Sequence, residues 1–91
     1  MERDQFVELL RQEGFEQLVT VEREPNGVLD LHQHPFEAKA LILDGELRLV
    51  HQDGREQVCR RGDLFHLAPN APHAESYGPE GVRYLVGRKP L

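Results

Sequence analysis

Residues 27–45 read GVLDLHQHPFEAKALILDG, and this stretch decides the fold. Apolar and polar residues alternate in its first part, residues 28–34, while residues 38–43 are apolar apart from one lysine. Alternation is typical of a β-strand with two different faces, and a short apolar run is typical of a strand buried on both faces. The stretch therefore predicts two strands, of which the second is covered on both sides.

The rest of the chain predicts further strands separated by turns. Turn residues recur at roughly 8–12 residue intervals, a spacing typical of β-sandwiches and barrels. We expect strands at residues 16–24, 28–34, 38–43, 46–52, 55–60, 63–67, 73–77 and 82–88. Before them, apolar residues on one face predict a helix over residues 4–13, which Gly14 ends in the left-handed conformation with Phe15 contacting Leu10. The chain is thus expected to be all-β with a short N-terminal helix.

Both faces of residues 38–43 need a cover. The N-terminal helix is one candidate and a second copy of the chain is another, and the two do not exclude each other. A chain of 91 residues buries only a moderate share of its surface, which also favours a partner subunit. Leu29 and Leu31 add an apolar face to the preceding strand. We therefore expect a homodimer that buries the Leu29/Leu31 side of its sheet.

The composition excludes several classes of function. With 91 residues, 38% of them hydrophobic and 30% charged, the chain is one domain. Its 11 Lys and Arg residues against 16 Asp and Glu give a net charge of −5, which argues against DNA or RNA as a partner. Residues 1–5 lack the features of a signal peptide and no long apolar run occurs, so we expect a cytoplasmic protein without membrane contact. The only cysteine, Cys59, excludes an intrachain disulfide and a thiolate metal cluster.

Two histidines of the opening stretch point to metal binding. His32 and His34 lie two positions apart in a predicted strand, so their rings project from the same face and can share one ion. The alternative is that this polar face of residues 28–34 is simply exposed to solvent, with Leu29 and Leu31 facing the core. The spacing alone does not separate the two interpretations.

A third histidine strengthens the metal interpretation. His73 follows a turn that contains two prolines, and a hairpin of this form can return it to the side of His32 and His34. Three neutral imidazoles form a suitable ligand set for zinc or for divalent iron, nickel, copper or manganese, with positions left for water or substrate. The alternative for His73 is a surface residue after a turn.

These two segments resemble the motifs of the cupin superfamily of small β-barrels. Residues 27–45 are similar to the first motif, in which a glycine precedes His-x-His, a glutamate and a second glycine. Residues 62–73 are similar to the second motif, in which a glycine is followed by a proline-containing turn and a histidine. The two motifs occur in the family's order and at a short separation, and the resemblance covers nearly everything after Gly14.

The resemblance implies both a fold and a site. It implies one domain, residues 1–91, with the helix in residues 1–14 and a double-stranded β-helix, or jelly-roll barrel, in residues 15–91. It also implies a divalent metal ion inside the barrel, held as in the similar thiol dioxygenases by histidines alone: His32, His34 and His73.

The carboxylate ligand of the family is missing from its usual position. Ala38 stands where the family has the glutamate, and Glu37 is one residue early and points to the opposite face by strand parity. A β-bulge near Pro35 is the one device that turns Glu37 inward. Glu75 shares a strand face with His73 and is the other candidate, as a general base or as a partner of an imidazole, although an exposed glutamate is the alternative.

The second motif also departs from the family pattern. Ala68 replaces its proline and Asn70 its glycine, but asparagine tolerates the left-handed conformation that such a turn requires. Tyr77 stands where the family has its closing asparagine, and its hydroxyl is a candidate group for the pocket, against the alternative of an aromatic at the barrel rim.

Other residues are expected in the pocket wall or at the surface. The apolar lining of a cavity, or equally an ordinary core, is predicted from four residues: Phe36, Ile42, Phe65 and Leu67. His51 and His66 are predicted to face solvent or to make structural hydrogen bonds.

The single cysteine lies in a charged stretch of sequence. Cys59 precedes Arg60 and Arg61, a cationic setting that predicts a lowered pKa for the thiol, unless the residue is structural. With Glu56 and Asp63 nearby, the two arginines are interpreted as a solvated, charge-balanced edge.

Two functions fit these expectations. One is a metal-dependent enzyme that isomerises, cleaves or oxygenates a small organic molecule. The other is a metal-free barrel that binds a small molecule as a sensor or accessory protein. Because one fold hosts many chemistries, the resemblance does not identify the substrate or the reaction.

Overall fold

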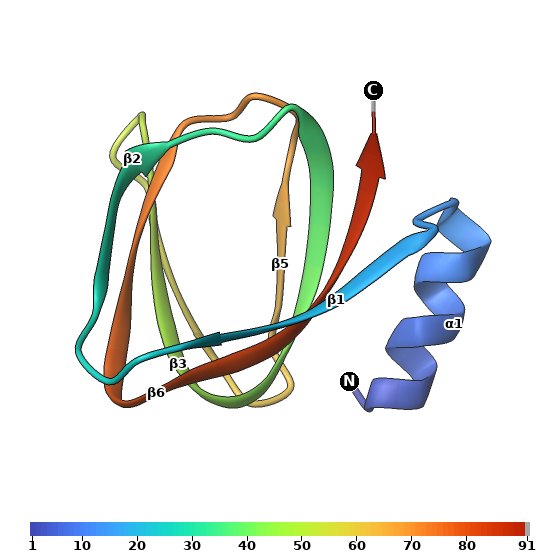
Figure 1. Ribbon diagram of the computed structural model, residues 1–91, viewed down its shortest axis with the longest axis horizontal. Coiled ribbons are helices and arrows are strands. Elements are labelled where there is room, and N and C mark those ends of the chain that lie inside the picture. The colour runs from blue at the N-terminus through green and yellow to red at the C-terminus, as the bar shows by residue number, and fades with distance from the viewer. Residues whose placement is uncertain (91) are drawn as a thin grey trace.

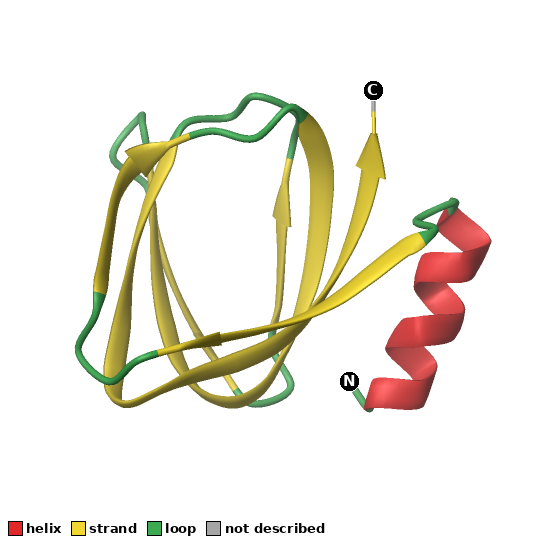
Figure 2. Ribbon diagram, in the orientation of Figure 1, coloured by secondary structure: helices red, strands yellow, loops and turns green. Residues whose placement is uncertain are grey.

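The computed structural model describes residues 1–90, one helix followed by strands that curl into a barrel (Figures 1 and 2). The elements, in chain order, are α1 (Arg3–Glu13), β1 (Gln17–Arg23), β2 (Val28–His32), β3 (Phe36–His51), β4 (Glu56–Arg60), β5 (Leu64–Leu67) and β6 (His73–Pro90). The expected class, an all-β jelly-roll barrel with a short N-terminal helix, is confirmed. The helix, the only one in residues 1–90, is too short to cross a membrane.

The two long strands, β3 and β6, form the frame of the barrel. They pair with each other over most of their lengths, and every pairing in the sheet is antiparallel. β6 also pairs with β2 near its start and with β1 near its end, while β3 also pairs with β5 and β4. In Figure 1 both strands bend sharply, so their two halves lie on different walls of the barrel.

The prediction of separate strands at 38–43 and 46–52, and at 73–77 and 82–88, was wrong. Each pair is one continuous strand, and the predicted turns are corners at which the strand changes direction without losing its partner. Gly45 and Gly81 sit at these corners with φ values of 80° and 73°. A Cβ atom at Gly45 would collide with the carbonyl oxygen of Gly81, so the two corners can nest only if position 45 is glycine.

The helix ends as its sequence predicts. Gly14 adopts a φ of 86°, and the N–H of Phe15 donates to the carbonyl of Leu10 at 2.9 Å. This left-handed ending turns the chain back, so Phe15 packs beside Leu10. The helix consequently lies along the outside of the barrel (Figure 2).

Two hydrophobic clusters lie on opposite faces of the sheet. The outer cluster fills the space between helix and sheet and contains Phe6, Leu10, Phe15, Leu41 and Leu85. The inner cluster fills part of the barrel and includes Ala38, Ala40, Ile42, Leu47, Leu49, Cys59, Phe65, Leu67, Tyr77, Val82, Tyr84 and Val86. Residues 38–43 are therefore covered on both faces, and the helix supplies the outer cover as predicted. Burying each large side chain fully contributes about 1.5–3 kcal/mol.

Candidate metal centre

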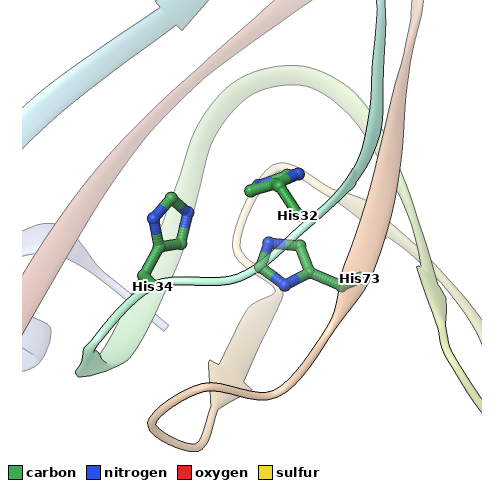
Figure 3. Close-up of side chains that lie close together, drawn as sticks. All are labelled: His32, His34 and His73. Carbon is green, nitrogen blue, oxygen red and sulfur yellow. The ribbon is translucent and has the colours of Figure 1, made fainter.

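The three predicted histidines come together inside the barrel. Figure 3 shows the rings of His32, His34 and His73 side by side, from β2, the loop after it and the first residue of β6. Their ring centroids are 4.2 Å apart for His32 and His73, 4.9 Å for His32 and His34, and 5.5 Å for His34 and His73. Each offers a ring nitrogen within 4.8 Å of those of the other two. The group therefore has the size of a single-ion site.

A bulge in β2 sets which of its side chains face inward. Leu29 is opposite Glu75 and His32 is opposite His73, so β2 has one more residue than β6 between these pairs. Leu29 and His32 both line the inside as a result, while Leu31 is 58% exposed. The expectation that Leu29 and Leu31 share one face is thus wrong, as is the alternative that the histidines face solvent.

A hydrogen bond between two loops brings His34 to the site. The strand β2 ends at His32, so His34 is not positioned by strand pairing as the sequence predicted. Instead its carbonyl accepts a hydrogen bond of 2.7 Å from the N–H of Asn70, in the turn before β6. Asn70 has a φ of 60°, the left-handed conformation expected for it. His34 also stacks on Phe36, with ring centroids 5.0 Å apart and planes 17° apart.

Backbone carbonyls fix the tautomers of two histidines. The Nδ1 of His32 lies 2.7 Å from the carbonyl oxygen of Asp30, and the Nδ1 of His73 lies 3.0 Å from that of Ala71. Because a carbonyl oxygen only accepts hydrogen bonds, both Nδ1 atoms carry the proton. The Nε2 atoms of the neutral rings therefore have free lone pairs. Both are buried and lack a hydrogen-bond partner among the described residues.

Glu75 points its carboxylate at these two lone pairs. Its Oε2 lies 3.5 Å from Nε2 of His32 and 3.4 Å from Nε2 of His73, and its side chain is only 7% exposed. The other oxygen, Oε1, accepts a hydrogen bond of 3.4 Å from the hydroxyl of Tyr77. The alternative of an exposed Glu75 is therefore wrong. The alternative of Tyr77 at the barrel rim is also wrong, because Tyr77 is buried.

The donor atoms fit a divalent metal ion. Two ligands bound about 2.1 Å from one ion at a tetrahedral angle are about 3.4 Å apart, which matches the distances from Glu75 to both Nε2 atoms. Without a cation or a proton between them, a buried carboxylate and two lone pairs repel one another. Neutral imidazole nitrogens with a carboxylate oxygen are a donor set typical of zinc and divalent iron or manganese.

The pKa values of His34 and His73 are shifted in opposite directions. Burial, with the neighbouring rings of His32 and His73, lowers the pKa of His34 and favours its neutral, ligating form. Burial also acts to lower the pKa of His73, but the Glu75 carboxylate and the Ala71 carbonyl outweigh it and raise that pKa above its ordinary value. His73 and Glu75 can therefore also hold a proton between them.

Glu37 lies outside the site, as strand parity predicts. Its Oε2 is 2.6 Å from Nε2 of His66 on the outer face of the sheet, so no bulge turns it inward. His66 thus makes the structural contact expected of it. His51 also faces an outer groove of about 490 Å³. In that groove Lys39 and Arg55 form ion pairs with Glu13 and Asp53, so its cations already have partners.

A small inner cavity adjoins the histidines. It measures about 80 Å³ and includes Phe36, Phe65 and Leu67 in its wall, as predicted, whereas Ile42 belongs to the core instead. Its wall also contains three residues that the sequence interpretation missed: Arg23, Tyr84 and Arg88. Two of them, Tyr84 and Arg88, could have been found from the alternation of side chains along a strand, because residues 82, 84, 86 and 88 fall on one face of β6. Burial raises the pKa of Tyr84, which keeps its hydroxyl protonated.

The thiol of Cys59 is not activated. Cys59 is fully buried in the inner cluster, and burial raises its pKa, with a contribution from Asp63. The predicted lowering by neighbouring arginines is wrong because Arg60 points to solvent, where it pairs with Glu46 at 3.3 Å. Cys59 is therefore a structural residue.

The family follows from comparison with known proteins. A family model for the cupin domain matches residues 19–86, so the chain belongs to the cupin domain family. The resemblance of the two histidine motifs is thereby confirmed. Among curated proteins, none matches the chain.

Solved structures share the fold at low sequence identity. An RmlC-like cupin from Shewanella frigidimarina NCIMB 400 is 21% identical with a TM-score of 0.71, over 82% of this chain and 66% of that one. The DMSP lyase DddQ from Ruegeria pomeroyi DSS-3 is 24% identical with a TM-score of 0.73, over 79% of this chain and 36% of that one. A DUF861 family protein from Thermotoga maritima is 21% identical with a TM-score of 0.69, over 88% of each chain. At these identities the likeness shows the fold alone.

Proposed function

We propose that this cupin domain binds one divalent transition metal ion through His32, His34 and His73, with Glu75 as the fourth donor. The observation that carries the proposal is the convergence of the Glu75 carboxylate on the two unpartnered Nε2 atoms. Glu75 thus takes the place of the carboxylate that Ala38 cannot supply, from a different strand. Iron, nickel, zinc, manganese and copper all remain candidates for the ion.

We further propose that the cavity beside the ion binds a small organic molecule, on which the protein acts. When bound, the ion supplies Lewis-acid chemistry or, if redox-active, oxygen chemistry. The chain itself supplies apolar walls and a buried tyrosine hydroxyl, Tyr77, that holds the far oxygen of Glu75. One DMSP lyase shares the fold, which supports a small-molecule role without identifying the molecule. We also propose that the protein is cytoplasmic.

A metal-free binding barrel is the second candidate. The raised pKa of His73 favours it, because a proton shared by His73 and Glu75 relieves the same repulsion that a metal ion relieves. In that case the barrel binds its small molecule without catalysis.

Metal analysis separates these functions. We expect freshly purified protein to contain one equivalent of a transition metal by plasma mass spectrometry and His34→Ala to contain almost none. His34→Ala should unfold at a urea concentration similar to that of the metal-free unsubstituted protein, since a bound ion stabilises the folded state. Metal-free protein that cannot be reloaded with zinc, iron(II), manganese, nickel or copper would support the binding barrel.

The role of Glu75 is tested against a matched glutamate. Glu37 lies near the site in sequence but bonds to His66 on the outer face. We expect Glu75→Gln to weaken zinc binding by 10- to 100-fold, on the order of the effects measured for metal-site partners, and to change the visible spectrum of the cobalt-loaded protein. Glu37→Gln should change neither. Equal zinc affinities of the two variants would remove Glu75 from the ligand set.

A further inference from the structure

Two arginines on the cavity wall lack a carboxylate partner. Arg23, at the end of β1, and Arg88, near the end of β6, both line the cavity that adjoins His34, His73 and Glu75. Within residues 1–90, neither has an acidic oxygen within ion-pair distance. Arg23 is exposed, whereas the Nε of Arg88 is buried without a hydrogen-bond partner. An unpaired buried donor on a charged group destabilises a protein unless something else accepts its hydrogen bond.

The lack of an ion pair at Arg23 and Arg88 contrasts with the excess of acidic residues in the chain. Acidic residues outnumber lysine and arginine by 16 to 11. Most other cations in the described part of the chain form ion pairs with these acidic residues. Examples are Arg11, Lys39, Arg48, Arg55 and Arg60. The other cations without an ion pair are exposed and do not line the cavity: Arg61, Arg83 and Lys89. No group in residues 1–90 accepts a hydrogen bond from the Nε of Arg88, which leaves this donor available to a ligand.

The guanidinium of Arg88 lies over an aromatic ring. Its guanidinium carbon lies 5.0 Å from the ring centroid of Phe36, within the range of a cation–π contact. Phe36 in turn stacks on His34, with centroids 5.0 Å apart. The guanidinium therefore sits one aromatic ring away from the proposed metal centre, and its edge remains free to donate two parallel hydrogen bonds.

The charge of the cavity wall is positive. Glu75 is the only acidic residue of the wall, and the two arginines outweigh it by one charge when the imidazoles are neutral. A divalent ion would raise this excess to three charges. A small cavity with a positive wall favours an anion, because charge interactions are screened less between protein walls than in bulk water.

We propose that the ligand of this cavity is a small organic carboxylate whose anionic group is bound by Arg88, with Arg23 adding positive charge at the wall. The apolar part of the wall, with Leu29, Phe65 and Leu67, suits the carbon skeleton of such a molecule and not an inorganic anion. The volume of about 80 Å³ limits the skeleton to a few carbon atoms. The inference rests on the proposed function only in placing a metal ion at the other end of the ligand.

Propionate and its neutral isostere propionamide test the proposal. We expect calorimetric titration of the zinc-loaded protein to show at least tenfold tighter binding of propionate than of propionamide, and weaker binding of inorganic phosphate. Arg88→Met, which keeps most of the side chain that covers Phe36, should weaken propionate binding at least tenfold. The matched control, Arg83→Met on the same strand, should leave it within twofold. Arg88→Lys, which keeps the charge, should fall between Arg88→Met and the unsubstituted protein.

The outcomes separate this inference from the metal proposal. The same titrations are made on metal-free protein, and metal content is measured on every sample. Preference for propionate that depends on Arg88 in a protein that takes up no metal would support the carboxylate site and overturn the metal centre. Equal binding of propionate and propionamide, binding of neither, or unchanged propionate binding in Arg88→Met would overturn the carboxylate site even in a zinc-loaded protein.

Discussion

The backbone N–H of Asn70 donates a hydrogen bond to the carbonyl oxygen of His34, at an N···O distance of 2.7 Å. Neither residue belongs to a strand, so no ladder of strand hydrogen bonds fixes their separation. The bond joins the loop after β2 to the turn before β6, and these two segments carry or adjoin all three imidazoles. The geometry of the candidate metal centre therefore depends on the shape of a turn.

Substitution of Asn70 tests this dependence. Its φ of 60° is tolerated by asparagine and glycine but not by a β-branched residue. We expect Asn70→Val to lower the free energy of unfolding of the metal-free protein by about 1–2 kcal/mol and to weaken zinc binding, whereas Asn70→Gly changes both little. Urea unfolding and competition with a zinc chelator measure the two effects. Undiminished zinc affinity in Asn70→Val would contradict the role of the turn.

The helix should contribute stability without affecting the site. Leu10 is fully buried between the helix and the sheet, on the opposite face from the histidines. We expect Leu10→Ala to cost about 2–5 kcal/mol in the free energy of unfolding, because it removes apolar contacts and leaves a cavity. Leu9→Ala, at a partly exposed position of the same helix, should cost less than about 1 kcal/mol. Both variants should bind zinc like the unsubstituted protein, and a loss of zinc affinity in Leu10→Ala alone would show that the helix shapes the site.

The thiol of Cys59 should be unreactive in the folded protein. Burial raises its pKa above the ordinary value of 9.0, so the neutral thiol is the form that the fold favours. This preference contributes stability below pH 9 and is lost as the pH rises through the folded-state pKa. We therefore expect Cys59 to react with a disulfide reagent at pH 8 far more slowly than in concentrated urea. Comparable rates in both conditions would place the thiol at the surface.

The structure narrows the surface on which we expect the homodimer interface. Leu29 lines the cavity, whereas Val28 and Leu31 are 70% and 58% exposed on the outside of β2. We expect sedimentation to show a dimer at micromolar concentration and Leu31→Glu to dissociate it. Leu18→Glu, at an exposed leucine of β1, serves as the control and should remain dimeric. A monomeric unsubstituted protein would refute the prediction.

Features with a local cause could be predicted from the sequence. The helix and its ending follow from apolar spacing and from Gly14, and the burial of residues 38–43 follows from their composition. The approach of His73 to His32 and His34 was implied by the resemblance to the two cupin motifs, because the spacing alone also allows His73 at the surface.

Features with a distant cause could not be predicted. The alternation of apolar and polar residues does not reveal a β-bulge, so the extra residue in β2 could not be predicted. The inward position of Leu29 and the exposure of Leu31 were missed for this reason. Gly45 and Gly81 predict a turn equally well whether a strand ends or only bends there. The sequence left a surface position open for Glu75, because its burial is created by β2 and β3, the strands that pair on either side of it.

The pairing of β6 with β1, β2 and β3 has a consequence for how the protein folds during synthesis. Residues 73–90 supply one proposed imidazole ligand, the proposed carboxylate ligand and one of the two arginines of the cavity wall, and they also pair with three earlier strands. Until the ribosome has released this segment, those strands lack their main partner and the site lacks half of its groups. Most contacts of the barrel then form between residues far apart in sequence, a topology that folds slowly. Metal uptake should therefore follow the release of the last strand and cannot guide the earlier steps of folding.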